Sequence, residues 1–162
     1  MSKATVALVS SLGGHSGQMK IICTQEVLGN RTVLFITEKQ LITKEYKEEK
    51  KFLDAHPVYY FRKDYLGLWP QRYITTCWKL YKLFKKERVD IVITNGAHLS
   101  IPAVLAAKFL NKKVIFIETF IRVKTPTLTG RFCYFFSDVF LVQHKKIAQK
   151  YGVRAIWRGS VL

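Results

Sequence analysis

Apolar, β-branched runs recur along the chain, and a segment with helical spacing follows most of them. The runs that predict strands are Thr5–Ser10, Thr32–Thr37, Val58–Phe61, Asp90–Thr94, Lys113–Ile117 and Val139–Val142. Helical spacing of apolar residues occupies Gly17–Leu28, Gln71–Arg88, Ile101–Leu110, Leu128–Phe136 and Lys145–Tyr151. Alternating strands and helices with almost continuously apolar strands are typical of a parallel sheet that is covered on both faces. We therefore expect an α/β fold, a Rossmann-like parallel sheet with helices on both faces.

The chain has 162 residues and no linker, low-complexity tract or internal repeat. That length predicts a single domain over residues 1–162. The segment Glu38–Lys51 is crowded with charges of both signs and is interpreted as a solvated helix or loop without chemistry. The first apolar run, Val6–Val9, is too short to span a bilayer or to form a signal-peptide core. We expect a cytosolic chain whose membrane contact is peripheral or through a partner.

The charge balance predicts an anionic partner. The net charge is +16, and 14% of the residues are aromatic. Such a chain suits nucleic acid, an acidic membrane surface or phosphorylated ligands. No nucleic-acid recognition motif is present, and the aromatic residues fall at core spacing. The cysteines Cys23, Cys77 and Cys133 form neither a CxxC pair nor a metal-ligand cluster, which favours buried thiols in a reducing compartment.

A glycine-rich turn follows the first strand and predicts a ligand site. Glycines at Gly13 and Gly14 let the backbone approach a ligand, and the next helix offers free N–H groups to an anion. The turn lacks the GxGxxG spacing of dinucleotide sites. His15 stands at the start of this helix, where an imidazole can act as a base or a phosphate partner. Ser11 belongs to the same turn. The alternative is a structural turn with a capping histidine.

A second small turn follows the fourth strand, at Asn95 and Gly96. It should lie beside the first turn in the sheet, because both follow parallel strands. We expect it to contribute to substrate binding. The alternative is a plain connection in which Ser100 caps the next helix.

The third candidate segment is Ile115–Gly130, where an apolar run ends in a carboxylate and an arginine follows four residues later. Charged groups just past the carboxyl end of a buried strand lie where open α/β sheets bind ligands. Arg122 could hold a phosphate or a sugar carboxylate through its planar fork of donors. Glu118 would then accept sugar hydroxyls or orient His15. The alternative is a structural ion pair between the two.

The helix Gln71–Arg88 carries much of the positive charge. At about 100° per residue, one side gathers Arg72, Thr75, Lys79, Lys82 and Lys86. The other side holds Ile74, Cys77, Trp78, Leu80, Tyr81 and Phe84, and Trp69 stands just before the helix. Aromatic residues beside lysines favour an interfacial helix on an anionic bilayer. The predicted membrane contacts are Trp69, Arg72, Trp78, Lys79, Lys82 and Lys86, and the alternative is a core-facing helix with a solvated back.

Several short motifs together resemble one known family. They are Gly13-Gly14-His15, Thr37-Glu38-Lys39, Thr94-Asn95-Gly96, Pro102, Glu118 with Arg122-Val123, Thr127-Leu128-Thr129-Gly130, Tyr134, Ser137-Asp138, Val142-Gln143, Tyr151 and Gly159. In this order they resemble the acceptor or anchor subunit of two-chain oligosaccharide UDP-glycosyltransferases. The family includes the anchor subunit of the eukaryotic chitobiose-forming enzyme and bacterial capsule and exopolysaccharide relatives. The resemblance covers essentially the whole chain and is most specific from Glu118 to Gln143.

The resemblance implies the N-terminal half of a GT-B glycosyltransferase, with the donor-binding half on a separate partner chain. It implies transfer from a UDP-sugar to a polyprenyl-diphosphate-linked sugar, with no bound metal or other cofactor. His15 matches the histidine proposed to take the acceptor proton, and Glu118 and Arg122 match the cleft motif. Many relatives carry an N-terminal membrane helix, whereas the first strand here begins at Thr5. His144 stands where relatives usually have tryptophan. The short basic form resembles the bacterial branch, peripheral at the cytoplasmic face of the plasma membrane.

Three functional hypotheses follow. The first is a catalytic half-enzyme that contributes His15 and the acceptor site. The second is a non-catalytic scaffold that recruits and activates a catalytic partner at the membrane. The third, a basic nucleic-acid-binding domain, is the least favoured because no recognition motif supports it.

Overall fold

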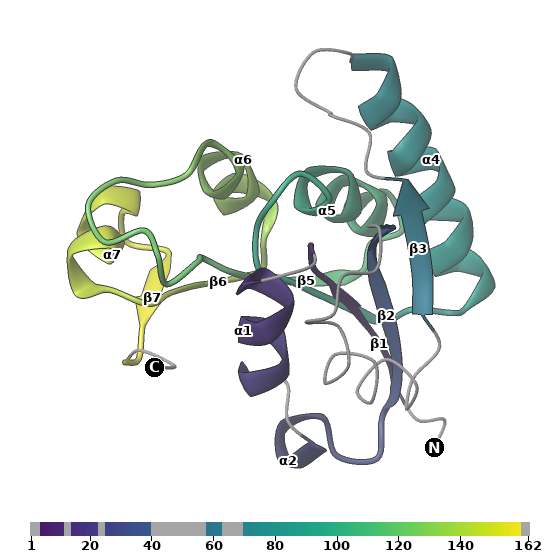
Figure 1. The fold of residues 1–162 in the computed structure, drawn as a ribbon, viewed down its shortest axis with the longest axis horizontal. Helices are drawn as coiled ribbons and strands as arrows, with labels where there is room; N and C mark the ends of the chain where they lie inside the picture. The colour runs from purple at the N-terminus through teal and green to yellow at the C-terminus, as the bar shows by residue number, and fades with distance from the viewer. Residues whose placement is uncertain (1–3, 12–13, 23–24, 40–57, 63–69, 160–162) are drawn as a thin grey trace.

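The structure is a computed structural model that describes residues 4–11, 14–22, 25–39, 58–62 and 70–159 (Figure 1). Gly13, Trp69, Cys23 and most of Glu38–Lys51 therefore lie outside the described residues, and the side chain of Arg72 is not described. No helix among the described residues is long and apolar enough to cross a bilayer.

The described strands form one parallel sheet in the order β3-β2-β1-β4-β5-β6-β7. They are β1 (Thr5–Val9), β2 (Thr32–Lys39), β3 (Val58–Arg62), β4 (Ile91–Thr94), β5 (Lys113–Ile117), β6 (Val139–Val142) and β7 (Ala155–Trp157). The helices are α1 (Gly14–Ile22), α2 (Gln25–Leu28), α4 (Pro70–Lys86), α5 (Ser100–Phe109), α6 (Leu128–Phe136) and α7 (Lys145–Tyr151). The Rossmann-like parallel sheet predicted from the sequence is confirmed.

Period-two alternation along the strands builds two cores, one on each face of the sheet. One core gathers Val6, Leu8, Val33, Phe35 and Ile93 beneath Met19 of α1. The core on the other face combines alternate strand residues with α4, α5, α6 and α7, and includes Ala7, Val9, Leu80, Phe84, Val104, Val114, Phe116, Cys133 and Ile147. In Figure 1, α1 and α2 lie below the sheet and α5 and α6 above it.

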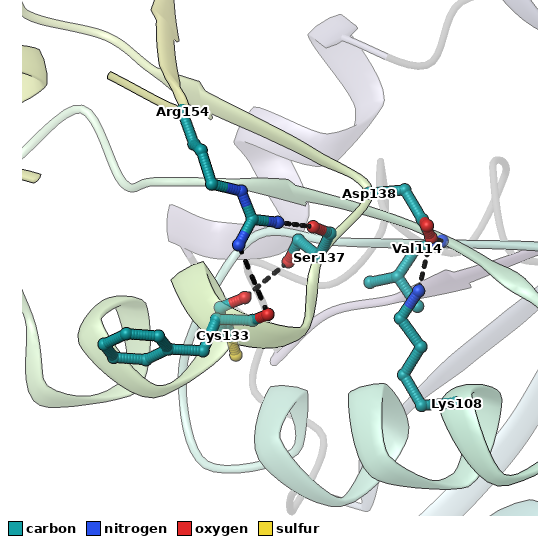
Figure 2. Close-up of polar contacts among 7 residues, drawn as sticks. Lys108, Val114, Cys133, Ser137, Asp138 and Arg154 are labelled. Atoms are coloured by element: carbon teal, nitrogen blue, oxygen red, sulfur yellow. Dashed lines mark hydrogen bonds and ion pairs between the residues drawn. The ribbon is translucent and has the colours of Figure 1, made fainter. Parts of the chain in front are cut away.

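Polar contacts fasten α5, α6 and β7 at the amino edge of the sheet (Figure 2). The Asp138 carboxylate accepts from Lys108 Nζ and from Val114 N, each at 2.7 Å. Partial burial raises the pKa of Asp138, but these two hydrogen bonds and the positive charges of Lys108 and Lys113 together outweigh it and hold the pKa below its ordinary value. Arg154 Nη2 donates to Ser137 O at 2.6 Å, and Ser137 Oγ donates to Cys133 O at 2.7 Å. The polar groups at the amino edge therefore stabilise the fold by joining these elements.

Three local differences from the sequence-based expectation have simple causes. Helix α1 begins at Gly14 rather than Gly17, because glycine costs only about 1 kcal/mol in a helix and does not prevent one. Ser100 is the first residue of α5, and Leu99 is its N-cap. The seventh strand, Ala155–Trp157, was not predicted, because it has only three residues and two of them, Ile156 and Trp157, are exposed at the sheet edge.

Candidate active site at the carboxyl edge of the sheet

The order in which the chain adds strands to the sheet reverses between β1 and β4. From β1 the chain proceeds to β2 and β3 on one side, and then returns to place β4 on the other side of β1. Open parallel sheets bind ligands outside the carboxyl ends of the strands at such a switch point. The turn after β1 leads into α1, and the turn after β4 leads into α5. Both predicted turns therefore meet where the fold favours a ligand.

Two hydrogen bonds join these turns through His15 and Asn95. The main-chain oxygen of Asn95 lies 3.0 Å from His15 Nδ1, and Asn95 Nδ2 donates to the main-chain oxygen of His15 at 2.5 Å. Asn95 is fully buried, whereas His15 is only half-buried. The pair therefore fixes the orientation of the imidazole, in a residue that is only partly buried.

This contact also decides how the neutral ring is protonated. A carbonyl oxygen can only accept, so Nδ1 must carry the proton in the bond to Asn95 O. The neutral imidazole then holds its lone pair on Nε2. An imidazole oriented in this way has the form required of a general base.

The turn after β4 is held in shape by its own contacts. Ser100 Oγ donates to Gly96 O at 2.5 Å and lies 2.6 Å from Thr94 Oγ1. Gly96 has φ +101°, in the left-handed region that favours glycine. A Cβ on Gly96 would stand 3.4 Å from His15 Cε1. The glycine thus gives the turn its path and lets the imidazole pack closely on it.

Two buried polar oxygens in these turns lack a hydrogen-bond partner in the described structure. Ser11 Oγ and Asn95 Oδ1 are both buried, and neither makes a hydrogen bond within the part of the chain that the structure describes. Buried polar atoms in native proteins nearly always have a partner in protein, water or ligand. A Cβ on Gly14, at the exposed start of α1, would meet nothing within 4 Å. The site therefore offers polar atoms and open space at a helix N-terminus.

Glu118 lies on the opposite face of the sheet from α1. It continues the alternation of Val114 and Phe116, which pack against α5 and α6, and its carboxylate accepts from Thr127 Oγ1 and from the hydroxyl of Tyr151. Glu118 is only 1% exposed. The expectation that it orients His15 is wrong, because its oxygens point to the other side. For the same reason, the Glu118 oxygens do not point to where they could accept hydrogen bonds from sugar hydroxyls beside His15.

Arg122 is exposed on the loop that follows β5. Within the described residues its side chain forms no ion pair with Glu118 and no other hydrogen bond. The structural alternative, a Glu118–Arg122 pair, is therefore not the arrangement found. The guanidinium remains available at the carboxyl edge, next along the sheet from the turn after β4.

Helix α4 places two of its apolar residues on its exposed side. Ile74 is 68% exposed and Trp78 57% exposed, so the alternative, a helix whose apolar side faces the core, does not hold for these two residues. The 3.6-residue period explains this, because positions 74, 78 and 82 form one stripe. Lys82 Nζ lies 5.2 Å from the Trp78 ring centre. Lys79 and Lys86 are exposed as well, so the predicted membrane contacts that the structure describes share one surface.

Thr127 and Tyr151 are polar site residues that sequence reasoning did not select. They appeared only as members of family motifs, because no local pattern links either residue to Glu118. The only sequence signal was the alternation in β5, which places residues 114, 116 and 118 on one face.

Comparison with known proteins identifies the family. The family described as "Oligosaccharide biosynthesis protein Alg14 like" matches residues 5–161. This chain belongs to the Alg14-like family. The Homo sapiens protein named UDP-N-acetylglucosamine transferase subunit ALG14 is 29% identical over 103 residues, which cover 58% of this chain and 47% of the relative. The subunit of the same name from Debaryomyces hansenii is 28% identical over 177 residues, covering 93% of this chain and 73% of the relative.

The Alg14-like chain spans about half the length of the first of these relatives and of the solved structures that it resembles. Acinetobacter baumannii MurG superposes with a TM-score of 0.73 at 16% identity, covering 96% of this chain and 45% of that one. The Neisseria meningitidis UDP-GlcNAc 2-epimerase gives a TM-score of 0.70 at 15% identity, covering 97% and 47%. The fold is therefore that of the N-terminal half of a GT-B protein, as the resemblance of the sequence motifs implied.

Proposed function

We propose that this Alg14-like chain is the acceptor-binding subunit of a two-chain glycosyltransferase. The complex transfers N-acetylglucosamine from UDP-N-acetylglucosamine to a sugar carried on a polyprenyl diphosphate. The observation that carries the proposal is the His15–Asn95 pair at the switch point of a GT-B N-terminal half. The names of the relatives support the donor sugar, and capsule or exopolysaccharide assembly rests on the resemblance of the motifs alone.

The chemistry assigned to this chain is removal of the acceptor proton. His15 Nε2 takes the proton from the attacking hydroxyl, while the Nδ1–H bond to Asn95 O holds the ring and stabilises the imidazolium that forms. The hydroxyl oxygen attacks the sugar carbon directly, and UDP leaves. Stabilisation of the leaving diphosphate falls to the partner chain. We propose that the reaction uses no bound metal.

The distribution of charge supports an anionic acceptor. Apart from buried Glu118, the carboxylates whose side chains the structure describes lie at the amino edge, at Glu87, Asp90 and Asp138. Exposed cations follow β5 and β6 at the carboxyl edge, at Arg122, Lys124, Lys145 and Lys146. An acceptor diphosphate approaching this edge therefore meets positive charge.

The membrane contact that we propose is the exposed face of α4, formed by Ile74, Trp78, Lys79, Lys82 and Lys86. Aromatic and aliphatic residues flanked by lysines suit the headgroup region of an anionic bilayer. This helix begins near the carboxyl edge, where β3 ends. Contact there keeps the active site close to a lipid-linked acceptor at the cytoplasmic face of the plasma membrane.

A binding experiment tests the division of labour between the chains. The purified chain is expected to bind a short-chain polyprenyl-diphosphate-linked sugar in calorimetry and to bind UDP-N-acetylglucosamine only when the partner chain is present. The reason is that this chain provides one wall of the cleft and the partner provides the donor site. Tight binding of UDP-N-acetylglucosamine by the chain alone would overturn the assignment.

A further inference from the structure

The loop Thr119–Thr127 joins β5 to α6 and presents Arg122 at the carboxyl edge. Its tip is exposed, with Ile121 66% and Val123 48% accessible. Ordering an exposed loop costs conformational entropy, which amounts to about 1 kcal/mol or more of free energy for each residue that is fixed. Contacts that fix it must therefore come from elsewhere in the fold.

Three contacts hold this loop, and two of them come from α7 and its N-cap, His144. His144 Nε2 lies 2.6 Å from Phe120 O, and Lys150 Nζ donates to Lys124 O at 2.5 Å. At the end of the loop, Thr127 Oγ1 lies 3.2 Å and 3.1 Å from the two oxygens of Glu118. The loop is thus held near its beginning, its middle and its end.

Glu118 is the centre of the third contact. Its Oε1 accepts from Thr119 N at 3.0 Å, and its Oε2 accepts from the Tyr151 hydroxyl. Burial, and then the Glu118 carboxylate, raise the pKa of Tyr151, so the hydroxyl remains a donor. A buried carboxylate is tolerated only when donors surround it in this way. Both ends of the loop therefore depend on one buried acid and one tyrosine.

Gly130 makes room for this cluster. A Cβ there would meet Tyr151 OH and Glu118 Oε2 in severe overlap and would lie 2.7 Å from Thr127 Oγ1. Gly130 N also donates to Thr127 Oγ1 at 2.8 Å, which makes Thr127 the N-cap of α6. The start of α6 and the end of the loop are therefore fixed together.

We propose that Glu118 and Tyr151 are positioning residues, which hold the loop Thr119–Thr127 so that Arg122 meets an anionic group of the acceptor. Neither residue contacts substrate. The inference rests on the proposed function for the identity of the ligand, and the bracing of the loop stands without it. Tyr151 acts from α7, 29 positions along the chain from the arginine that it serves.

The test compares Tyr151→Phe with Tyr134→Phe in the full chain. Each variant removes one hydroxyl from the same pair of stacked rings, whose centres lie 5.6 Å apart. The Tyr134 hydroxyl accepts from Arg154 N at the amino edge, whereas the loop follows β5 at the carboxyl edge. Amide exchange over residues 119–127 should become at least about tenfold faster in Tyr151→Phe, because a hydrogen bond to a charged group is lost. It should not change in Tyr134→Phe.

A ligand measurement separates positioning from simple stability. Farnesyl diphosphate is the probe, and Arg122→Gln should weaken its binding about tenfold. Tyr151→Phe should weaken binding in the natural chain but add nothing in the Arg122→Gln background, because it acts through Arg122. Additive losses, unchanged exchange, or equal exchange in both tyrosine variants would overturn the proposal. So would a natural chain that fails to bind the probe.

A milder variant covers the case in which Tyr151→Phe does not fold. Lys150→Met removes only the donor to Lys124 O from an exposed side chain, and should also speed exchange in the loop. Failure of the proposed transferase activity is seen separately, in sugar transfer by the two-chain complex. The exchange measurement does not depend on that result.

Discussion

Replacement of His15 by alanine is expected to lower the turnover of the two-chain complex by roughly 10²- to 10⁴-fold, the range for loss of a general base. The physical reason is that the ring, oriented through Nδ1 by Asn95 O, is the group that we assign to accept the hydroxyl proton. Initial rates at saturating substrates measure the effect. The variant should still fold and therefore still associate with the partner, because His15 belongs to neither hydrophobic core.

Two control variants make this result specific. His15→Asn keeps a donor that can reach Asn95 O but has no basic nitrogen, so it should be almost as inactive as His15→Ala. His98→Ala removes an exposed histidine from the turn after β4 and should leave turnover nearly unchanged. Activity of His15→Asn within a few-fold of the natural chain would make the histidine a structural clamp and favour the scaffold hypothesis.

Loss of positive charge from α4 is expected to release the protein from anionic vesicles. Each basic group near such a surface contributes about 1 kcal/mol, so replacing Arg72, Lys79, Lys82 and Lys86 with glutamine should weaken binding about 10³-fold. Co-sedimentation with vesicles at low and high salt measures the change. Transfer to a lipid-linked acceptor should slow, and transfer to a short, water-soluble acceptor should survive.

A charge-matched variant tests whether the position of these residues matters. Glutamine at Lys113, Lys145, Lys146 and Arg158 removes the same net charge from exposed residues elsewhere. This variant should remain bound far more tightly than the α4 variant. Equal binding by the two variants, or binding to neutral vesicles that equals binding to anionic vesicles, would show that α4 is an ordinary solvated helix.

The sequence predicted the fold well, because burial on both faces makes strands of a parallel sheet continuously apolar. The runs at Val6–Val9 and Val114–Ile117 show this pattern clearly. Ala155–Trp157 does not, because an edge strand has one open side and needs fewer apolar residues. For Ile74 and Trp78 the sequence left both a membrane-facing and a core-facing side open, because hydrophobicity alone does not distinguish a core contact from an exposed apolar stripe.

The site was predicted in part. The turns at His15 and Asn95 could be placed together, because glycine-rich turns after parallel strands share one edge. Glu118 was assigned to the same cleft because it follows a strand, although the alternation of Val114 and Phe116 directs it to the other face. Its bonds to Thr127 and Tyr151 join residues up to 33 positions apart, and no local pattern encodes such contacts.

Sugar transfer by the chain with and without its partner tests the central claim most directly. The measurement follows labelled N-acetylglucosamine from its UDP donor into a polyprenyl-diphosphate-linked acceptor. We predict almost no transfer by this chain alone, almost none by the partner alone, and rapid transfer by the two together, because each supplies one wall of the cleft. Strong transfer by the purified chain alone, or no transfer by the reconstituted pair, would contradict the account.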